Sequence, residues 1–76
     1  MPHVIIKLYA GRSEETKAKL AEELTKAVKS ALNSSDDSIS VAIEDVKPEH
    51  WTETVYKPDI LGKPETIYKK PGHDPL

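Results

Sequence analysis

The chain has 76 residues, a net charge of −2 and no cysteine. Its length predicts a single domain over residues 1–76, and the lack of cysteine excludes disulfides, thiol catalysis and thiolate metal sites. Because 11 basic residues face 13 acidic ones, charge gives no basis for binding nucleic acid. The N-terminus lacks a signal peptide pattern, and no apolar run approaches the roughly 20 residues of a membrane span. We therefore expect a soluble, cytoplasmic protein with neither nucleic acid nor membrane as partner.

A chain of this size is marginally stable alone, because folding buries only about 60% of its surface. Small domains usually gain stability from disulfides, a bound metal or a partner subunit. The three histidines, at 3, 50 and 73, have no metal-binding spacing, and we predict no metal or organic cofactor. A homo-oligomer is therefore the expected source of stability.

Residues 3–9 have the composition and alternation of a strand, with Pro2, Val4, Ile6 and Leu8 on its apolar face. Gly11 predicts a turn after this strand.

Ser13 then has the sequence pattern of a helix N-cap, followed by two glutamates in the first turn. The predicted helix buries one apolar stripe, formed by residues 20, 21, 24, 27, 28, 31 and 32. Polar residues 33–37 predict its end.

Residues 38–44 return to a period of two and predict a second strand, with Ile39, Val41 and Ile43 on one face. Strand, helix and strand at this spacing predict a βαβ unit, in which the two strands are parallel. The fold class is therefore α/β, or α+β when the C-terminal part is included. Two strands and one helix cannot complete a sheet, so a second copy of the chain is needed.

The C-terminal third is rich in proline. Pro48 suits the first position of a short helix over residues 49–56, which presents Trp51 and Val55. Pro58, Gly62 and Pro64 are expected to break the chain after it. Residues 66–70 predict a short strand, and the last four residues are expected to fray.

Most catalytic motifs are missing, because the chain has neither a Gly-x-Ser-x-Gly sequence nor a glycine-rich phosphate loop. The unusual feature is Pro2, which follows the initiator methionine. A small second residue generally permits removal of that methionine, and Pro2 would then carry a free secondary amine. Desolvation and a nearby cation lower the pKa of such an amine toward neutrality, where a general base works best. A proline here can equally serve only to start the strand.

Three segments resemble the 4-oxalocrotonate tautomerase family. They are Met-Pro-His-Val-Ile-Ile-Lys at the start, Gly-Arg-Ser-Glu-Glu-Thr-Lys from residue 11 and Ser-Ile-Ser-Val-Ala-Ile-Glu-Asp-Val from residue 38. The resemblance covers residues 2–51 and implies a βαβ unit with an amino-terminal catalytic proline. The region from Lys47 is similar to a dimeric subgroup that includes tautomerases of phenylpyruvate-type enols.

This resemblance implies an isomerase that interconverts the keto and enol forms of 2-oxo acids such as phenylpyruvate or 2-hydroxymuconate. Pro2 matches the general base, and Arg12 matches an arginine that binds the substrate carboxylate and polarises its carbonyl. Trp51 matches an aromatic residue that lines an apolar pocket. The second arginine of the archetype aligns with Ser40, which implies a hydrogen-bonding contact and the loss of one anchor for a dicarboxylate. Without the family, Arg12 reads as a solvated turn residue and Trp51 as part of the core.

The length of the first strand constrains this site. Residues 2 to 9 span roughly 23 Å in an extended strand, so one arginine side chain cannot reach from position 12 back to Pro2. Arg12 must then come from another subunit. Antiparallel pairing of two first strands would bring it there, in a four-stranded sheet with its helices on one face. We therefore prefer a dimer to a hexamer.

Two alternatives remain open. In the same family, a protonated proline acts as an acid while a carboxylate activates water, which gives a hydratase or dehalogenase of unsaturated acids. Glu53 is the nearest candidate for that carboxylate. The chain can also be a non-catalytic dimeric binding module, because a retained Met1 would convert the nitrogen of Pro2 into an amide without basicity.

Overall fold

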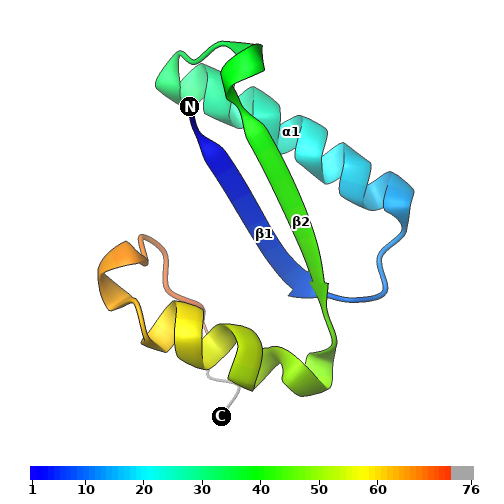
Figure 1. The fold of residues 1–76 in the computed structure, drawn as a ribbon, viewed down its shortest axis with the longest axis vertical. Coiled ribbons are helices and arrows are strands. Elements are labelled where there is room, and N and C mark those ends of the chain that lie inside the picture. The colour runs from blue at the N-terminus through cyan, green and yellow to red at the C-terminus, as the bar shows by residue number, and fades with distance from the viewer. Residues whose placement is uncertain (73–76) are drawn as a thin grey trace.

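The computed structural model describes residues 1–72, so the predicted fraying of residues 73–76 lies outside the described residues. Two parallel strands, β1 (His3–Tyr9) and β2 (Ser40–Val46), form the sheet, and the helix α1 (Glu14–Leu32) connects them. Figure 1 shows α1 lying along the sheet and the C-terminal helical part at the opposite end from the N-terminus. The predicted βαβ unit is confirmed.

Strand β1 matches its predicted bounds, and its alternation follows the burial of its side chains. The apolar residues Val4, Ile6 and Leu8 are half-buried, whereas His3, Ile5 and Tyr9 are exposed. Because the register pairs His3 with Ser40 and Tyr9 with Val46, the two strands are aligned along their full length. Helix α1 packs against β2, and the other face of the sheet is left partly open.

The predicted bounds of the second strand were wrong by two residues at each end. Residues Asp36–Ser38 form a single 3-10 turn, in which the N–H of Ser38 donates to the carbonyl of Ser35 at 3.2 Å. This turn delays the strand to Ser40, and pairing with β1 then carries it to Val46.

The C-terminal helix is longer than predicted. After a 3-10 turn at Pro48–His50, a wide helix of the π type runs from Thr52 to Leu61 and passes through Pro58. Proline lacks the N–H of a regular helix and its ring crowds a preceding carbonyl, and a wider turn relieves that crowding.

Gly62 ends this helix. Its N–H donates to the carbonyl of Lys57 at 2.8 Å, and a Cβ at this position would lie 2.6 Å from the carbonyl oxygen of Pro58.

The predicted strand over residues 66–70 was wrong. Pro64–Thr66 form a 3-10 turn, and both the N–H and the hydroxyl of Thr66 donate to the carbonyl of Lys63. The segment that follows forms no ladder, because neither strand of the described sheet pairs with it.

The chain buries little of itself. Within residues 1–72, Val55 and Tyr56 are the only buried hydrophobic residues, and they are still 5% and 7% exposed. The exposed surface is 5818 Å², whereas roughly 4,700 Å² is typical of a folded chain of this mass. Ile5 and Tyr9 on the open face of the sheet remain 51% and 47% exposed. A larger exposed surface and exposed apolar side chains such as these are typical of the subunit of an oligomer.

One ion pair fastens the C-terminal helix to the sheet. Lys7 of β1 donates to the Oδ2 atom of Asp59 at 2.5 Å, and each side chain is less than one third exposed. This hydrogen bond lowers the pKa of the Asp59 carboxyl and raises the pKa of Lys7. The depressed pKa of Asp59 makes the pair stabilising above about pH 4 and progressively weaker in more acidic solution.

We therefore expect Asp59→Asn to lower the thermal midpoint at pH 7, and the difference from wild type to shrink as the pH falls below about 4. Thermal unfolding followed by circular dichroism across this range measures the effect. Asp37→Asn is the matched control, because Asp37 is exposed and no described lysine or arginine pairs with it. Equal midpoints for Asp59→Asn and wild type at pH 7 would contradict a stabilising role of the pair.

Candidate active site

Pro2 and Ser40 lie together at the amino end of the sheet. The N–H of Ser40 donates to the carbonyl of Pro2 at 3.2 Å, which fixes the start of β1 against the start of β2. Pro2 is half-buried, whereas Met1 is fully exposed to solvent. Removal of Met1 therefore exposes a prolyl nitrogen without breaking a packed contact.

His3 joins this group, and the sequence analysis did not identify it as part of the site. Its Nδ1 atom lies 2.6 Å from the Oγ atom of Ser40, within hydrogen-bonding distance. Both side chains are exposed, and the register places them opposite each other on the parallel strands. The predicted parallel pairing was the signal that could have identified His3. Two parallel strands that start at the same level bring positions 3 and 40 side by side.

Arg12 lies at the other end of β1, in the turn that leads to α1. Gly11 permits this turn, because its φ of 125° is a conformation that residues with side chains rarely adopt. Arg12 is exposed, and no carboxylate of the described chain forms an ion pair with it. Its guanidinium is therefore available to an anionic ligand.

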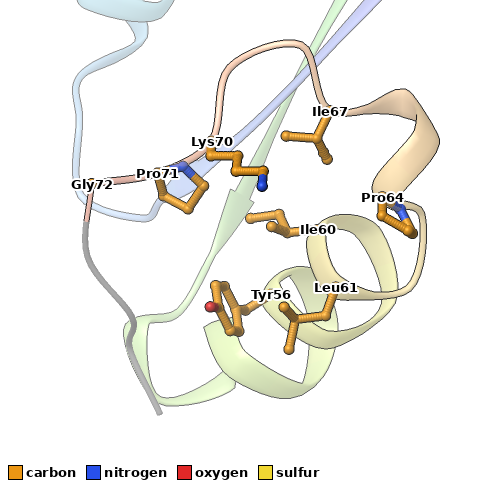
Figure 2. Close-up of a pocket in the computed structure, with 8 residues that line it drawn as sticks. All are labelled: Tyr56, Ile60, Leu61, Pro64, Ile67, Lys70, Pro71 and Gly72. Carbon is orange, nitrogen blue, oxygen red and sulfur yellow. The ribbon is translucent and has the colours of Figure 1, made fainter.

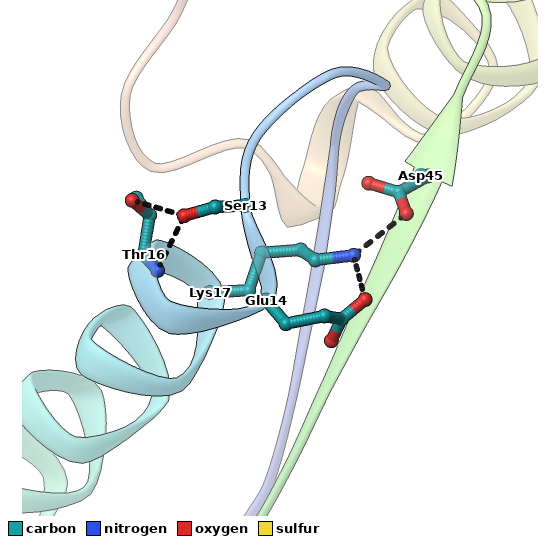
Figure 3. A network of polar contacts seen from close by, with 5 residues as sticks. All are labelled: Ser13, Glu14, Thr16, Lys17 and Asp45. Atoms are coloured by element: carbon teal, nitrogen blue, oxygen red, sulfur yellow. Dashed lines mark hydrogen bonds and ion pairs between the residues drawn. The ribbon is translucent and has the colours of Figure 1, made fainter.

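The start of α1 holds this turn in place (Figure 3). Ser13 caps the helix by accepting from the N–H of Thr16 at 3.0 Å. Lys17 bridges the Oδ2 atom of Asp45 at 2.8 Å and Glu14 at 3.1 Å, and these hydrogen bonds raise the pKa of Lys17. These contacts hold the start of α1, which follows Arg12 in the chain, against β2.

Trp51 lies at the same end as Arg12. Its ring meets the ring of Tyr9 edge to face, with the centroids 5.1 Å apart. Together with Ile5, Val55 and Ile60, Trp51 lines an open groove of about 660 Å³ on the face of the sheet. Because Trp51 is half-buried and borders this groove, it is accessible to a ligand. Tyr9 is the second aromatic residue of this end, and the sequence analysis did not assign it to the site.

The four predicted site residues thus fall into two groups within one chain. Pro2 and Ser40 occupy the amino end of the sheet, and Arg12 and Trp51 occupy the carboxyl end. A strand of this length separates the groups by roughly 23 Å.

Glu53, the carboxylate considered for water activation, belongs to the carboxyl end. It is exposed and accepts from the Nζ atom of Lys57 at 2.8 Å. Among residues 1–72, no three side chains of a metal-binding type gather, and no helix is long and apolar enough to cross a bilayer.

A separate pocket of about 460 Å³ lies in the C-terminal part (Figure 2). Its lining includes Tyr56, Ile60 and Ile67, and Lys70 lies above Tyr56 and Ile60 in this view. None of the four predicted site residues borders this pocket.

Comparison with known proteins agrees with the fold. The family described as "Tautomerase enzyme" matches residues 2–54. A probable tautomerase of Xylella fastidiosa is 40% identical over 76 residues, which is all of this chain and 93% of the relative. Tautomerase PptA of Pectobacterium carotovorum is 42% identical over 74 residues, covering 96% of this chain and 97% of the relative.

Solved structures give the same result. The crystal structure of YwhB, a homologue of 4-oxalocrotonate tautomerase, superposes with a TM-score of 0.63 at 39% identity, over 64% of this chain and 80% of YwhB. TomN, a 4-oxalocrotonate tautomerase homologue in the tomaymycin biosynthetic pathway, gives a TM-score of 0.64 at 28% identity, over 86% and 97% of the two chains.

The family match over residues 2–54 and the relatives of similar length place the chain in the class of small isomerases with a βαβ fold. The chain belongs to the tautomerase family, and its full-length relatives are tautomerases.

Proposed function

We propose that the mature chain catalyses keto–enol tautomerisation of 2-oxo acids that carry one carboxylate and an apolar or aromatic tail, such as phenylpyruvate. The observation that carries this proposal is the position of Pro2, half-buried at the start of β1 and preceded by an exposed methionine. The family membership supports the same reaction class.

The reaction needs only one base that moves a proton. The prolyl nitrogen removes the hydroxyl proton of the enol, the carbonyl forms as the carbon–carbon double bond is lost, and the proton returns to the adjacent carbon. The guanidinium of Arg12 binds the carboxylate and stabilises negative charge on the oxygen as it develops. Trp51 contacts the tail and excludes water.

Two chains build this site in our proposal. Since Pro2 and Arg12 occupy opposite ends of a seven-residue strand, the arginine of each site belongs to a second copy. The outer edge of β1 is unpaired within the described sheet, so two copies can pair along it in antiparallel orientation. The resulting dimer has a four-stranded sheet, and it covers apolar surface that the single chain leaves exposed.

The proposed substrate class follows from the residues at the two ends of the sheet. Arg12 supplies one cation for one carboxylate, and the groove beside Trp51 suits an apolar tail. At the position where the archetype has a second arginine, this chain has Ser40, which cannot neutralise a second carboxylate. Glu53 is already paired with Lys57, and this pairing gives no support to the hydratase alternative.

We expect Arg12→Ala to lower kcat/KM for phenylenolpyruvate by about 10- to 150-fold, because it removes a charge-assisted contact to the carboxylate. The fold is expected to stay intact, since the side chain is exposed in a turn. Ketonisation followed by absorbance measures the effect. Arg12→Lys should recover part of the activity, and Lys47→Ala is the matched control for loss of an exposed cation. Full activity of Arg12→Ala would contradict the role in carboxylate binding.

A further inference from the structure

We infer that His3 is a positioning residue, whose imidazole orients the hydroxyl of Ser40 as a neutral hydrogen-bonding group beside Pro2. This inference rests on the proposed function and adds a determinant of its substrate class. The oriented hydroxyl binds an uncharged carbonyl or hydroxyl oxygen of the substrate, in place of a second carboxylate.

The geometry leaves little freedom to this hydroxyl. The backbone N–H of Ser40 is held by the carbonyl of Pro2 at 3.2 Å, and its side chain is held by His3 at 2.6 Å. The backbone of His3 is itself fixed, because it is the first residue of β1 and directly follows Pro2. The backbone and side chain of Ser40 are therefore both anchored to the residues that carry the proposed base.

The bond to His3 leaves part of the hydrogen-bonding capacity of Ser40 for a ligand. A serine hydroxyl has one donor and two acceptor positions, and the bond to the imidazole uses one of them. Both side chains are exposed, so the remaining positions are open to a ligand, and the hydrogen bond from the N–H of Ser40 to the carbonyl of Pro2 keeps Ser40 close to that residue. A bound hydroxyl points in a fixed direction, whereas a free one rotates and loses entropy on binding a ligand.

The absence of charge gives this subsite its selectivity. Within residues 1–72, neither His3 nor Ser40 takes part in an ion pair, and no arginine or lysine replaces the cation that a second carboxylate requires. Transfer of an unpaired carboxylate to this end would lose hydration without a compensating charge. The pair therefore favours a substrate that presents a neutral oxygen to Ser40.

The test measures whether His3 and Ser40 act as one unit. We expect His3→Ala and Ser40→Ala each to lower kcat/KM for phenylenolpyruvate by about 3- to 10-fold. Because His3 acts through Ser40, the double variant should lose no more than Ser40→Ala alone. His3→Asn, whose amide can reach the same oxygen as Nδ1, should return activity to within about 2-fold of wild type. Ser30→Ala, an exposed serine of α1, is the matched control.

Two results would overturn the inference. Losses that multiply in the double variant would show that the two residues act independently. Unchanged kinetics in His3→Ala, together with a lowered thermal midpoint, would show that the bond only joins the strands.

A direct binding measurement separates this inference from the proposed function. Calorimetric titration of the mature protein with phenylpyruvate needs no turnover. If wild type binds but does not ketonise phenylenolpyruvate, the proposed function fails, and weaker binding by His3→Ala still supports the pair. Equal binding by His3→Ala and wild type, or no binding by either, overturns it. Ser40→Arg should improve kcat/KM for 2-hydroxymuconate relative to phenylenolpyruvate, and an unchanged ratio would contradict the selectivity.

Discussion

Pro2→Ala should lower kcat for the ketonisation of phenylenolpyruvate by about 10²- to 10⁴-fold, which is the usual contribution of a positioned general base. Alanine leaves a primary amine in place of the rigid secondary amine, so a small residual activity is expected. The fold should survive, because the contact that fixes this residue is its backbone carbonyl, which alanine retains. Stopped-flow absorbance of the enol measures the effect.

Blocking the amine gives an independent control for the same role. Insertion of one glycine between Met1 and Pro2 converts the prolyl nitrogen into an amide without basicity, and this variant should lose at least as much activity as Pro2→Ala. Intact mass of the wild type establishes that Met1 has been removed. Unchanged turnover in either variant would remove Pro2 from the mechanism. Loss of turnover with retained phenylpyruvate binding would separate the catalytic role from the binding-module alternative.

The βαβ unit was predictable because local pattern and tertiary packing agree over residues 3–46. The alternation in β1 specifies its half-buried face, and Ser13 caps α1 as its sequence indicates. The predicted buried stripe of α1 was only partly right, because residues 20, 21, 24 and 28 are half-buried whereas residues 27, 31 and 32 are exposed. Asn33 ends α1 in the left-handed conformation that favours asparagine or glycine. Both bounds of β2 were shifted by two residues, because a 3-10 turn cannot be distinguished from a strand start by alternation alone and pairing with β1 carries the strand to Val46.

The C-terminal part was less predictable because its structure depends on tertiary contacts rather than on the hydrophobic periodicity of the sequence. Proline at position 58 reads locally as a helix break, yet Lys7 holds the helix through Asp59 beyond that point. Residues 66–70 have strand composition but find no strand to pair with in the described chain. Strand formation requires a partner, and the sequence of one segment does not reveal one.

The arrangement of the candidate site residues was predictable only in part. Strand length alone separates Pro2 from Arg12, and β1 has the length that the estimate used. No pattern in the sequence indicated at which end of the sheet Trp51 lies. Its contact with Tyr9 places it at the end of Arg12, and the pair His3 and Ser40 at the end of Pro2 also follows only from the register.

This arrangement predicts the outcome of mixing inactive variants. If each site takes Pro2 from one chain and Arg12 from another, Pro2→Ala mixed with Arg12→Ala under subunit exchange should recover about a quarter of wild-type activity. Half of the randomly formed dimers are mixed, and each of these has one site with both substitutions and one with neither. If both residues came from the same chain, every site would keep one substitution and mixing would restore nothing.

The position of Trp51 sharpens this experiment, because Arg12 and Trp51 share one end of the chain and should enter a site together. Pro2→Ala mixed with Trp51→Ala should therefore also recover about a quarter of the activity. Arg12→Ala mixed with Trp51→Ala should recover no activity. In a mixed dimer, one chain supplies both position 12 and position 51 to each site, and that chain carries one of the two substitutions. Native mass spectrometry establishes that subunits have exchanged. Rescue in this last mixture would show that Trp51 acts with the Pro2 of its own chain, and no rescue in the first mixture would exclude a site shared between chains.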